Sequence, residues 1–123
     1  MEMPATILIA EDYDDNRELL RLLLEAADYT VWEAKNGREC LDLARENHPD
    51  LIMVDLSMPL IDGWEVFKEL KADSATAPIP CVAVTAHADV DRQRAIELGF
   101  SAFVAKPFRT EELLSTVARL IGR

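Results

Sequence analysis

The sequence predicts an α/β domain: five strand–helix units that build a doubly wound, five-stranded parallel sheet. Short apolar runs alternate along the chain with segments of helical periodicity, which is the pattern of parallel-sheet proteins. The run from Leu51 to Val54 is apolar at every position, as expected for a strand buried on both faces. With 123 residues, half of them hydrophobic, the chain is long enough for one domain with a proper core.

The expected strands are the short apolar runs. They are predicted at residues 7–10, 31–34, 51–55, 79–84 and 102–105. The second run is shorter and less apolar, which favours an edge position. Because crossovers between parallel strands are right-handed, few topologies remain, and the strand order 2-1-3-4-5 is expected. This order makes the first and third strands neighbours at the switch point, where such sheets bind ligands.

Helices are expected between the strands, each with one apolar face. Asn36-Gly37 should open the second helix and Asp62 should cap the third, while Thr110 is expected to cap the last helix in place of Arg109. The inward positions of the first, second, third and last helices are expected to be Leu20, Leu23, Leu24 and Ala27; Cys40, Leu43 and Ala44; Gly63, Val66, Phe67 and Leu70; and Leu114, Val117, Ala118 and Ile121.

The helix expected at about residues 89–98 differs, because its apolar residues scatter around its circumference. Gly99 should end it. Trp32 and Trp64 lie beside the main apolar stripes, which favours half-buried packing over ligand stacking. Cys40 and Cys81 have no metal-ligand spacing and are expected to be reduced core residues.

The composition argues against several kinds of binding partner and location. The formal net charge of −10 opposes non-specific binding to nucleic acid or to anionic membranes. No apolar run approaches the ~20 residues of a membrane span, and no basic region precedes the first apolar run. We therefore expect a cytoplasmic protein.

Reactive polar residues follow four of the five expected strands. Glu11-Asp12, Asp55, Thr85 and Lys106 all stand at carboxyl ends, so the fold should bring them to one edge of the sheet. Three crowded carboxylates should raise at least one pKa or require a cation, and the one positive charge of Lys106 is not enough. An oxygen-rich, partly hydrated site suits Mg²⁺. A metal, a lysine and a hydroxyl around a free carboxylate predict aspartyl-phosphate chemistry, with the carboxylate as nucleophile.

These residues occur in short motifs. They are Ile9-Ala10-Glu11-Asp12, Val54-Asp55-Leu56-Ser57-Met58-Pro59 with Asp62-Gly63, Val84-Thr85-Ala86, and Lys106-Pro107-Phe108. Asp12, Asp55, Thr85 and Lys106 are separated by 43, 30 and 21 residues. With this spacing, the sequence from Ile7 to Ile121 resembles the receiver domains of two-component response regulators, which have a flavodoxin-like fold.

The resemblance implies a role for each site residue. Asp55 would accept a phosphoryl group from a phosphohistidine on a sensor histidine kinase or a histidine phosphotransfer protein. Asp12, Asp55 and the Ser57 backbone carbonyl would bind Mg²⁺ directly, and Glu11 through water. Lys106, whose bond to Pro107 is usually cis in the family, would pair with the phosphoryl oxygens. Thr85 would donate its hydroxyl to the phosphoryl group.

The resemblance also implies a switch residue, Phe103, and an output surface on the fourth helix, fifth strand and fifth helix. Glu11 stands where aspartate is commonest, and Phe103 where many members have tyrosine. Ser57 and His87 occupy positions that tune dephosphorylation in the family, although an exposed loop residue is the favoured interpretation of His87. We expect one receiver domain over residues 1–123, with a core of about 6–121 and no effector domain.

Other functions fit the residues less well. An aspartate-nucleophile phosphatase of the haloacid dehalogenase kind needs a second acid two residues after Asp55, where Ser57 stands. A flavodoxin-like flavin carrier needs a phosphate-binding loop after the first strand, where this chain is acidic. A pseudo-receiver that binds partners without phosphorylation would not need the acidic residues and Lys106.

Overall fold

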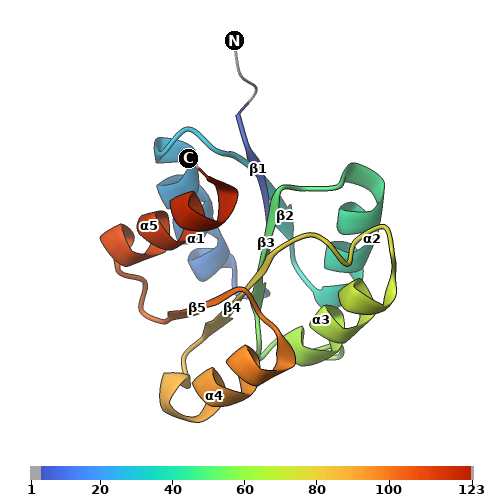
Figure 1. The fold of residues 1–123 in the computed structure, drawn as a ribbon. Coiled ribbons are helices and arrows are strands. Elements are labelled where there is room, and N and C mark those ends of the chain that lie inside the picture. Colours follow the sequence, from blue (N-terminus) through green and yellow to red (C-terminus); the bar gives the residue numbers. More distant parts are fainter. Residues whose placement is uncertain (1–3, 123) are drawn as a thin grey trace.

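The computed structural model describes residues 4–122 as a parallel five-stranded sheet with five helices around it (Figure 1). Strands and helices alternate along the chain: β1 (Thr6–Ala10), α1 (Asp14–Ala26), β2 (Thr30–Ala34), α2 (Gly37–Asn47), β3 (Leu51–Asp55), α3 (Gly63–Ala72), β4 (Cys81–Thr85), α4 (Ala88–Leu98), β5 (Ala102–Ala105) and α5 (Thr110–Ile121). The strand order is β2-β1-β3-β4-β5, which confirms the predicted topology and the edge position of β2.

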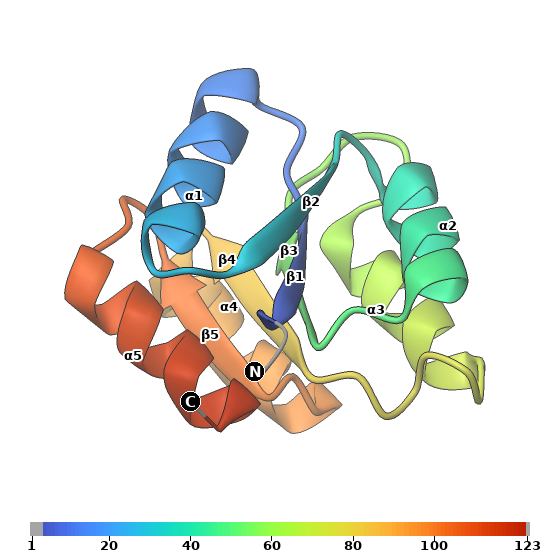
Figure 2. The same cartoon turned by 90° about the horizontal axis from the view of Figure 1, so that it is seen from above.

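The helices cover both faces of the sheet. Figures 1 and 2 show α1 and α5 on one side and α2 and α3 on the other. Every residue of the inner strands β3 and β4 is buried, and β1 is buried after Thr6. This burial is the reason that β3 and β4 are apolar up to their last residue instead of alternating.

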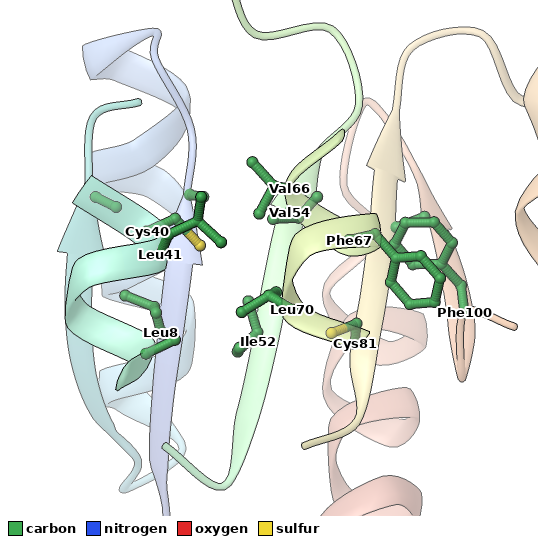
Figure 3. Packing of buried hydrophobic residues seen from close by; sticks show 14 of the residues in the cluster. Leu8, Cys40, Leu41, Ile52, Val54, Val66, Phe67, Leu70, Cys81 and Phe100 are labelled. Carbon is green, nitrogen blue, oxygen red and sulfur yellow. The ribbon is translucent and has the colours of Figure 1, made fainter. Parts of the chain in front are cut away.

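Side chains of each inner strand alternate between two cores. Ile52 and Val54 of β3 face α2 and α3, whereas Leu51 and Met53 face α1 and α5. Figure 3 shows the first of these cores, in which Phe67 of α3 stacks on Phe100, with ring centroids 3.9 Å apart. Cys40 and Cys81 are free and buried in the same core, as the sequence predicted.

Some helix boundaries follow from the residues at their ends. The Asn36 side chain accepts a hydrogen bond from the Glu39 amide, and Asp62 accepts one from Glu65, so both predicted caps are confirmed. Gly99 ends α4 with a φ of 107°, a left-handed conformation that glycine adopts without strain. Trp32 and Trp64 are half-buried against the α2–α3 core.

Three local predictions were wrong. β4 begins at Cys81, not at residue 79, because Pro80 has no N–H to donate to the ladder. Thr110 does not cap α5: the cap residue is Arg109, which makes no side-chain capping bond. The buried faces of α5 and α2 also include Leu113 and Leu41, which the sequence prediction did not contain. The predicted inward residues Leu114, Ala118 and Ile121 are only half-buried.

α4 is the least anchored helix of the sheet, because Ala95 is its one buried residue. Val90, Ile96 and Leu98 are all more than half exposed. The scattered apolar residues of the sequence therefore correctly indicated a weakly packed helix. No helix among residues 4–122 combines the length and apolar character that crossing a bilayer requires.

Gly63 lets α3 begin directly against the end of β3. A β-carbon at this position would lie 2.4 Å from the Asp55 carbonyl oxygen and 2.7 Å from the Leu56 α-carbon. Both are backbone atoms, which cannot move aside as a flexible side chain can. The close approach of α3 thus fixes the loop that follows Asp55.

Gly63→Ala should lower the free energy of unfolding by about 3 kcal/mol or more, since overpacking against backbone forces the main chain to shift. Gly122→Ala is the matched control: Gly122 has a φ of 85° but open space around it. That change should cost no more than about 1–2 kcal/mol. Urea unfolding of both variants measures the difference, and equal costs would contradict the close packing at Gly63.

Candidate functional site

The polar residues after β1, β3 and β5 are held by backbone hydrogen bonds that extend the sheet. The Glu11 amide donates to the Ala34 carbonyl at 3.1 Å, and the Leu56 amide to Val84 at 3.0 Å. The Lys106 amide donates to the Thr85 carbonyl at 2.8 Å. Because these bonds continue the strand ladders, the loops leave the sheet at fixed positions and their side chains converge.

Three carboxylates meet at this edge. Glu11, Asp12 and Asp55 each offer an oxygen, and the three oxygens lie within 4.8 Å of one another. Glu11 and Asp55 are only 2% and 3% exposed, whereas Asp12 faces solvent. The sequence predicted this convergence correctly. Two of the three negative charges are therefore placed where water cannot screen them well.

Lys106 reaches across the cluster and bridges the two buried carboxylates. Its Nζ lies 2.6 Å from Glu11 Oε1 and 2.7 Å from Asp55 Oδ2. The bond from Lys106 to Pro107 is cis, as in the family that the sequence resembles. One ammonium group cannot neutralise three carboxylates, so the cluster retains an excess of negative charge.

The pKa values of the two buried carboxyl groups, Glu11 and Asp55, are shifted in opposite directions. Burial, together with a hydrogen bond to Asp55, raises the pKa of Glu11 to about 7. Burial would also raise the pKa of Asp55, but hydrogen bonds from Glu11, Lys106 and the Ser57 amide outweigh it and lower that pKa. Burial opposes the charge of Lys106, yet its bonds to Asp55 and Glu11 raise the Lys106 pKa. The arrangement keeps Asp55 ionised, as a nucleophile requires.

Ser57 holds the second oxygen of Asp55. Its amide and its hydroxyl donate to Asp55 Oδ1 at 2.9 and 3.1 Å. Because Oδ2 is bound by Lys106, both oxygens of Asp55 are fixed. A phosphatase of the haloacid dehalogenase kind would have a second acid at the Ser57 position.

The donor set fits Mg²⁺. The three side chains that converge offer carboxylate oxygens, the cluster carries excess negative charge, and Asp12 lies at the solvent side, where a hydrated ion can enter. Asp12 and Asp55 would hold the ion, with Glu11 behind them. The role predicted for the Ser57 carbonyl stays a prediction.

The Thr85 hydroxyl bonds to a residue outside the acidic cluster, and Phe103 lines a groove. Thr85 is fully buried, and its hydroxyl donates to Asp91 of α4 at 2.8 Å. Phe103 is half-buried and lines a groove of about 610 Å³ between α4, β5 and α5. His87 is exposed, in agreement with its favoured interpretation, and it precedes α4.

Two supporting residues were missed by the sequence analysis. Arg17 of α1 is 8% exposed and donates to the Glu11 carbonyl at 3.0 Å; its guanidinium also pairs with Asp14 and with Glu33 of β2. Arg17 therefore connects the segment after β1, which carries Glu11, to α1 and β2. Asp91, the partner of Thr85, was the second. No spacing distinguishes either residue from the other charged residues nearby.

Fold and site together define a class of protein, an α/β domain with an acidic, lysine-bridged cluster suited to phosphoryl transfer to a carboxylate. Comparisons identify the family. The family model of the response regulator receiver domain matches residues 7–118. The polar-differentiation response regulator DivK of Brucella anthropi is 40% identical over 121 residues, which is 98% of each chain.

Solved structures agree. A protein from Chloroflexus aurantiacus assigned as a response regulator superposes with a TM-score of 0.92 at 34% identity, covering 98% of this chain and all of the other. The receiver domain of the sensor histidine kinase PA1611 from Pseudomonas aeruginosa, with magnesium coordinated in its active-site cleft, has a TM-score of 0.90 at 29% identity and covers the same shares.

The chain belongs to the response regulator receiver domain family. It is a signalling domain of a two-component system, a switch that works by accepting a phosphoryl group. The predicted family, fold and general function are thereby confirmed.

The raised pKa of Glu11 predicts a pH dependence of stability in the metal-free protein. Between the ordinary value of 4.5 and about 7, folded Glu11 holds a proton that the unfolded chain lacks. Its contribution is therefore complete below 4.5 and is lost as the pH rises through about 7. The free energy of unfolding should fall by at most about 3 kcal/mol over this pH range.

Urea unfolding in the presence of a chelator, from about pH 5 to about pH 8, measures this loss. Glu11→Gln keeps the shape of the side chain but cannot ionise, so its unfolding free energy should fall less over the same range. Parallel curves for the variant and the parent would show that other carboxylates cause the pH dependence.

Proposed function

We propose that Asp55 is the phosphoacceptor and that it receives the phosphoryl group from a phosphohistidine on a sensor histidine kinase or a phosphotransfer protein. The observation that carries the proposal is the state of Asp55, a buried carboxylate held in its ionised form by Lys106 and Ser57. It lies at the strand tip where the phosphoacceptor of the family's motif is expected. The core of this single receiver domain extends over about residues 6–121.

In the proposed reaction, one oxygen of Asp55 attacks phosphorus and forms a P–O bond. The P–N bond to the partner's imidazole breaks, and its electron pair stays on that nitrogen. Lys106 already lies 2.7 Å from Asp55, so its ammonium can follow the charge from the carboxylate to the phosphoryl oxygens. Bound Mg²⁺ would supply positive charge to the same oxygens.

Reversal of the switch uses water instead of a second enzyme. Water attacks phosphorus, the P–O bond to Asp55 breaks, and inorganic phosphate leaves. The domain therefore promotes its own dephosphorylation without turning over a separate substrate. Ser57 lies beside Asp55 and is positioned to influence this step.

The surface that changes on phosphorylation and that a protein partner recognises is formed by α4, β5 and α5. The groove between these elements is lined by Phe103 and is bordered by the weakly anchored α4. A phosphoryl group adds about −1.5 to −2 charges at neutral pH. This charge draws Lys106 and Thr85 inward and changes the surface that Phe103 presents to a protein partner.

Incubated with Mg²⁺ and acetyl phosphate, the protein should gain one acid-labile phosphoryl group. Asp55→Asn should gain none, because a neutral amide cannot act as the nucleophile. Asp62→Asn is the control, since Asp62 caps α3 and asparagine can keep that cap. Intact-mass spectrometry reads the labelling, and equal labelling of the Asp55 variant would refute the assignment.

Asp12→Ala should weaken Mg²⁺ binding at least about tenfold, because a direct ligand is lost. Without metal it should leave stability unchanged or raise it by up to about 1 kcal/mol, since repulsion against Asp55 is relieved. Asp15→Ala removes the same charge from the first turn of α1 and should change neither property by as much. Calorimetric Mg²⁺ titration and urea unfolding with chelator test both effects; equal Mg²⁺ affinities for the two variants would exclude Asp12 as a ligand.

A further inference from the structure

The hydroxyl of Thr85 is fully engaged away from the acidic cluster. It accepts a hydrogen bond from the His87 amide at 2.9 Å and donates its proton to Asp91 Oδ2 at 2.8 Å. Thr85 is wholly buried, so water cannot replace either partner easily. A hydroxyl has one proton to donate, and here Thr85 donates it to the Asp91 carboxylate.

Asp91 connects this hydroxyl to α4. It lies in the first turn of the helix and is half-buried. Further along, α4 is held by buried Ala95 and by Arg94, whose guanidinium lies 4.1 Å from the Trp64 ring centroid. At the end of the helix nearest the site, the neighbouring residues Asp89 and Val90 are exposed. The bond from Thr85 to Asp91 therefore fastens this end of α4 to β4.

We propose that Asp91 is a positioning residue that holds the Thr85 hydroxyl away from the phosphoryl site, and that phosphorylation moves α4 by drawing the Thr85 hydrogen bond from Asp91 to the phosphoryl group. The inference rests on the proposed function of Asp55 and Thr85. Thr85 cannot donate to Asp91 and to a phosphoryl oxygen at once. Phosphorylation of Asp55 and attachment of α4 are therefore competing states.

The competition is between two anions, which makes the switch sensitive. Hydrogen bonds to a carboxylate and to a phosphoryl oxygen are both charge-assisted and of similar strength. When Thr85 donates to the phosphoryl group, Asp91 is left half-buried without its hydrogen-bond donor, close to added negative charge. The carboxylate then moves to water, and the first turn of α4 moves with it.

Two consequences can be measured. Removing the Asp91 carboxylate frees the Thr85 hydroxyl to donate elsewhere before phosphorylation. Acetyl phosphate should then reach half-maximal labelling at a concentration at least about fivefold lower than in the wild type. In the unphosphorylated variant, amide resonances of residues 88–92 should already shift toward their phosphorylated positions. Asp91→Asn keeps an acceptor oxygen without the charge, so its effect should be intermediate.

The experiment compares Asp91→Ala, Asp91→Asn and Asp89→Ala by intact-mass labelling and amide NMR, at saturating Mg²⁺. Asp89→Ala removes the same charge from the same helical turn but no bond to Thr85, and it should behave as the wild type. Asp91→Ala is also made in a Thr85→Val background, which keeps the shape and removes the hydroxyl. There the Asp91 change should have no effect on the half-maximal concentration.

The outcomes separate this inference from the proposed function. If the wild type is labelled at Asp55 but Asp91→Ala needs the same concentration of acetyl phosphate, the competition is refuted and the phosphoacceptor assignment stands. An equal effect of Asp91→Ala with and without the Thr85 hydroxyl would also refute it, because that effect would come from the helix alone. If the wild type takes no phosphoryl group at Asp55, the proposed function fails and this inference fails with it.

Discussion

The bridge from Lys106 to Glu11 and Asp55 is the interaction on which the site depends. Two carboxylates with 2% and 3% exposure would repel each other strongly without a cation between them. The ammonium lies 2.6 and 2.7 Å from their oxygens and makes their burial possible. The two carboxyl groups also differ in protonation: Glu11 takes up a proton near neutrality, while Asp55 stays ionised. The fold supplies this bridge because β1, β3 and β5 all end at one edge of a single parallel sheet.

Residues whose positions follow from the main chain could be predicted from the sequence. Leu51 to Val54 are apolar because a central strand is covered on both sides, and this burial fixes where Asp55 emerges. The same reasoning placed Glu11, Asp12 and Lys106 at one edge, since parallel strands share their direction. Asn36 and Asp62 were found as caps because a capping bond connects residues three apart in the chain. These features depend on local spacing and strand direction, both of which the sequence contains.

Contacts between side chains from different elements could not be predicted in the same way. The chain has 23 acidic residues, and no local rule selects Asp91 as the partner of Thr85 or Asp14 and Glu33 as partners of Arg17. In α5, Leu113 and Leu114 are adjacent and equally apolar, so periodicity cannot decide which is buried; contact with the core selects Leu113. These choices depend on the distance between elements, which becomes known only once the sheet is assembled.

Uneven packing of α3 and α4 explains why a change at the strand tips should reach one surface and not another. α3 buries Val66, Phe67 and Leu70, and Gly63 brings its first turn against the backbone of β3. A shift of Asp55 therefore meets a helix that resists movement. α4 buries only Ala95, and a single hydrogen bond from Thr85 to Asp91 fastens the end nearest the site. Because densely packed interiors transmit strain rather than absorb it, the proposed displacement is expected where packing is weakest, on the α4 side of the sheet.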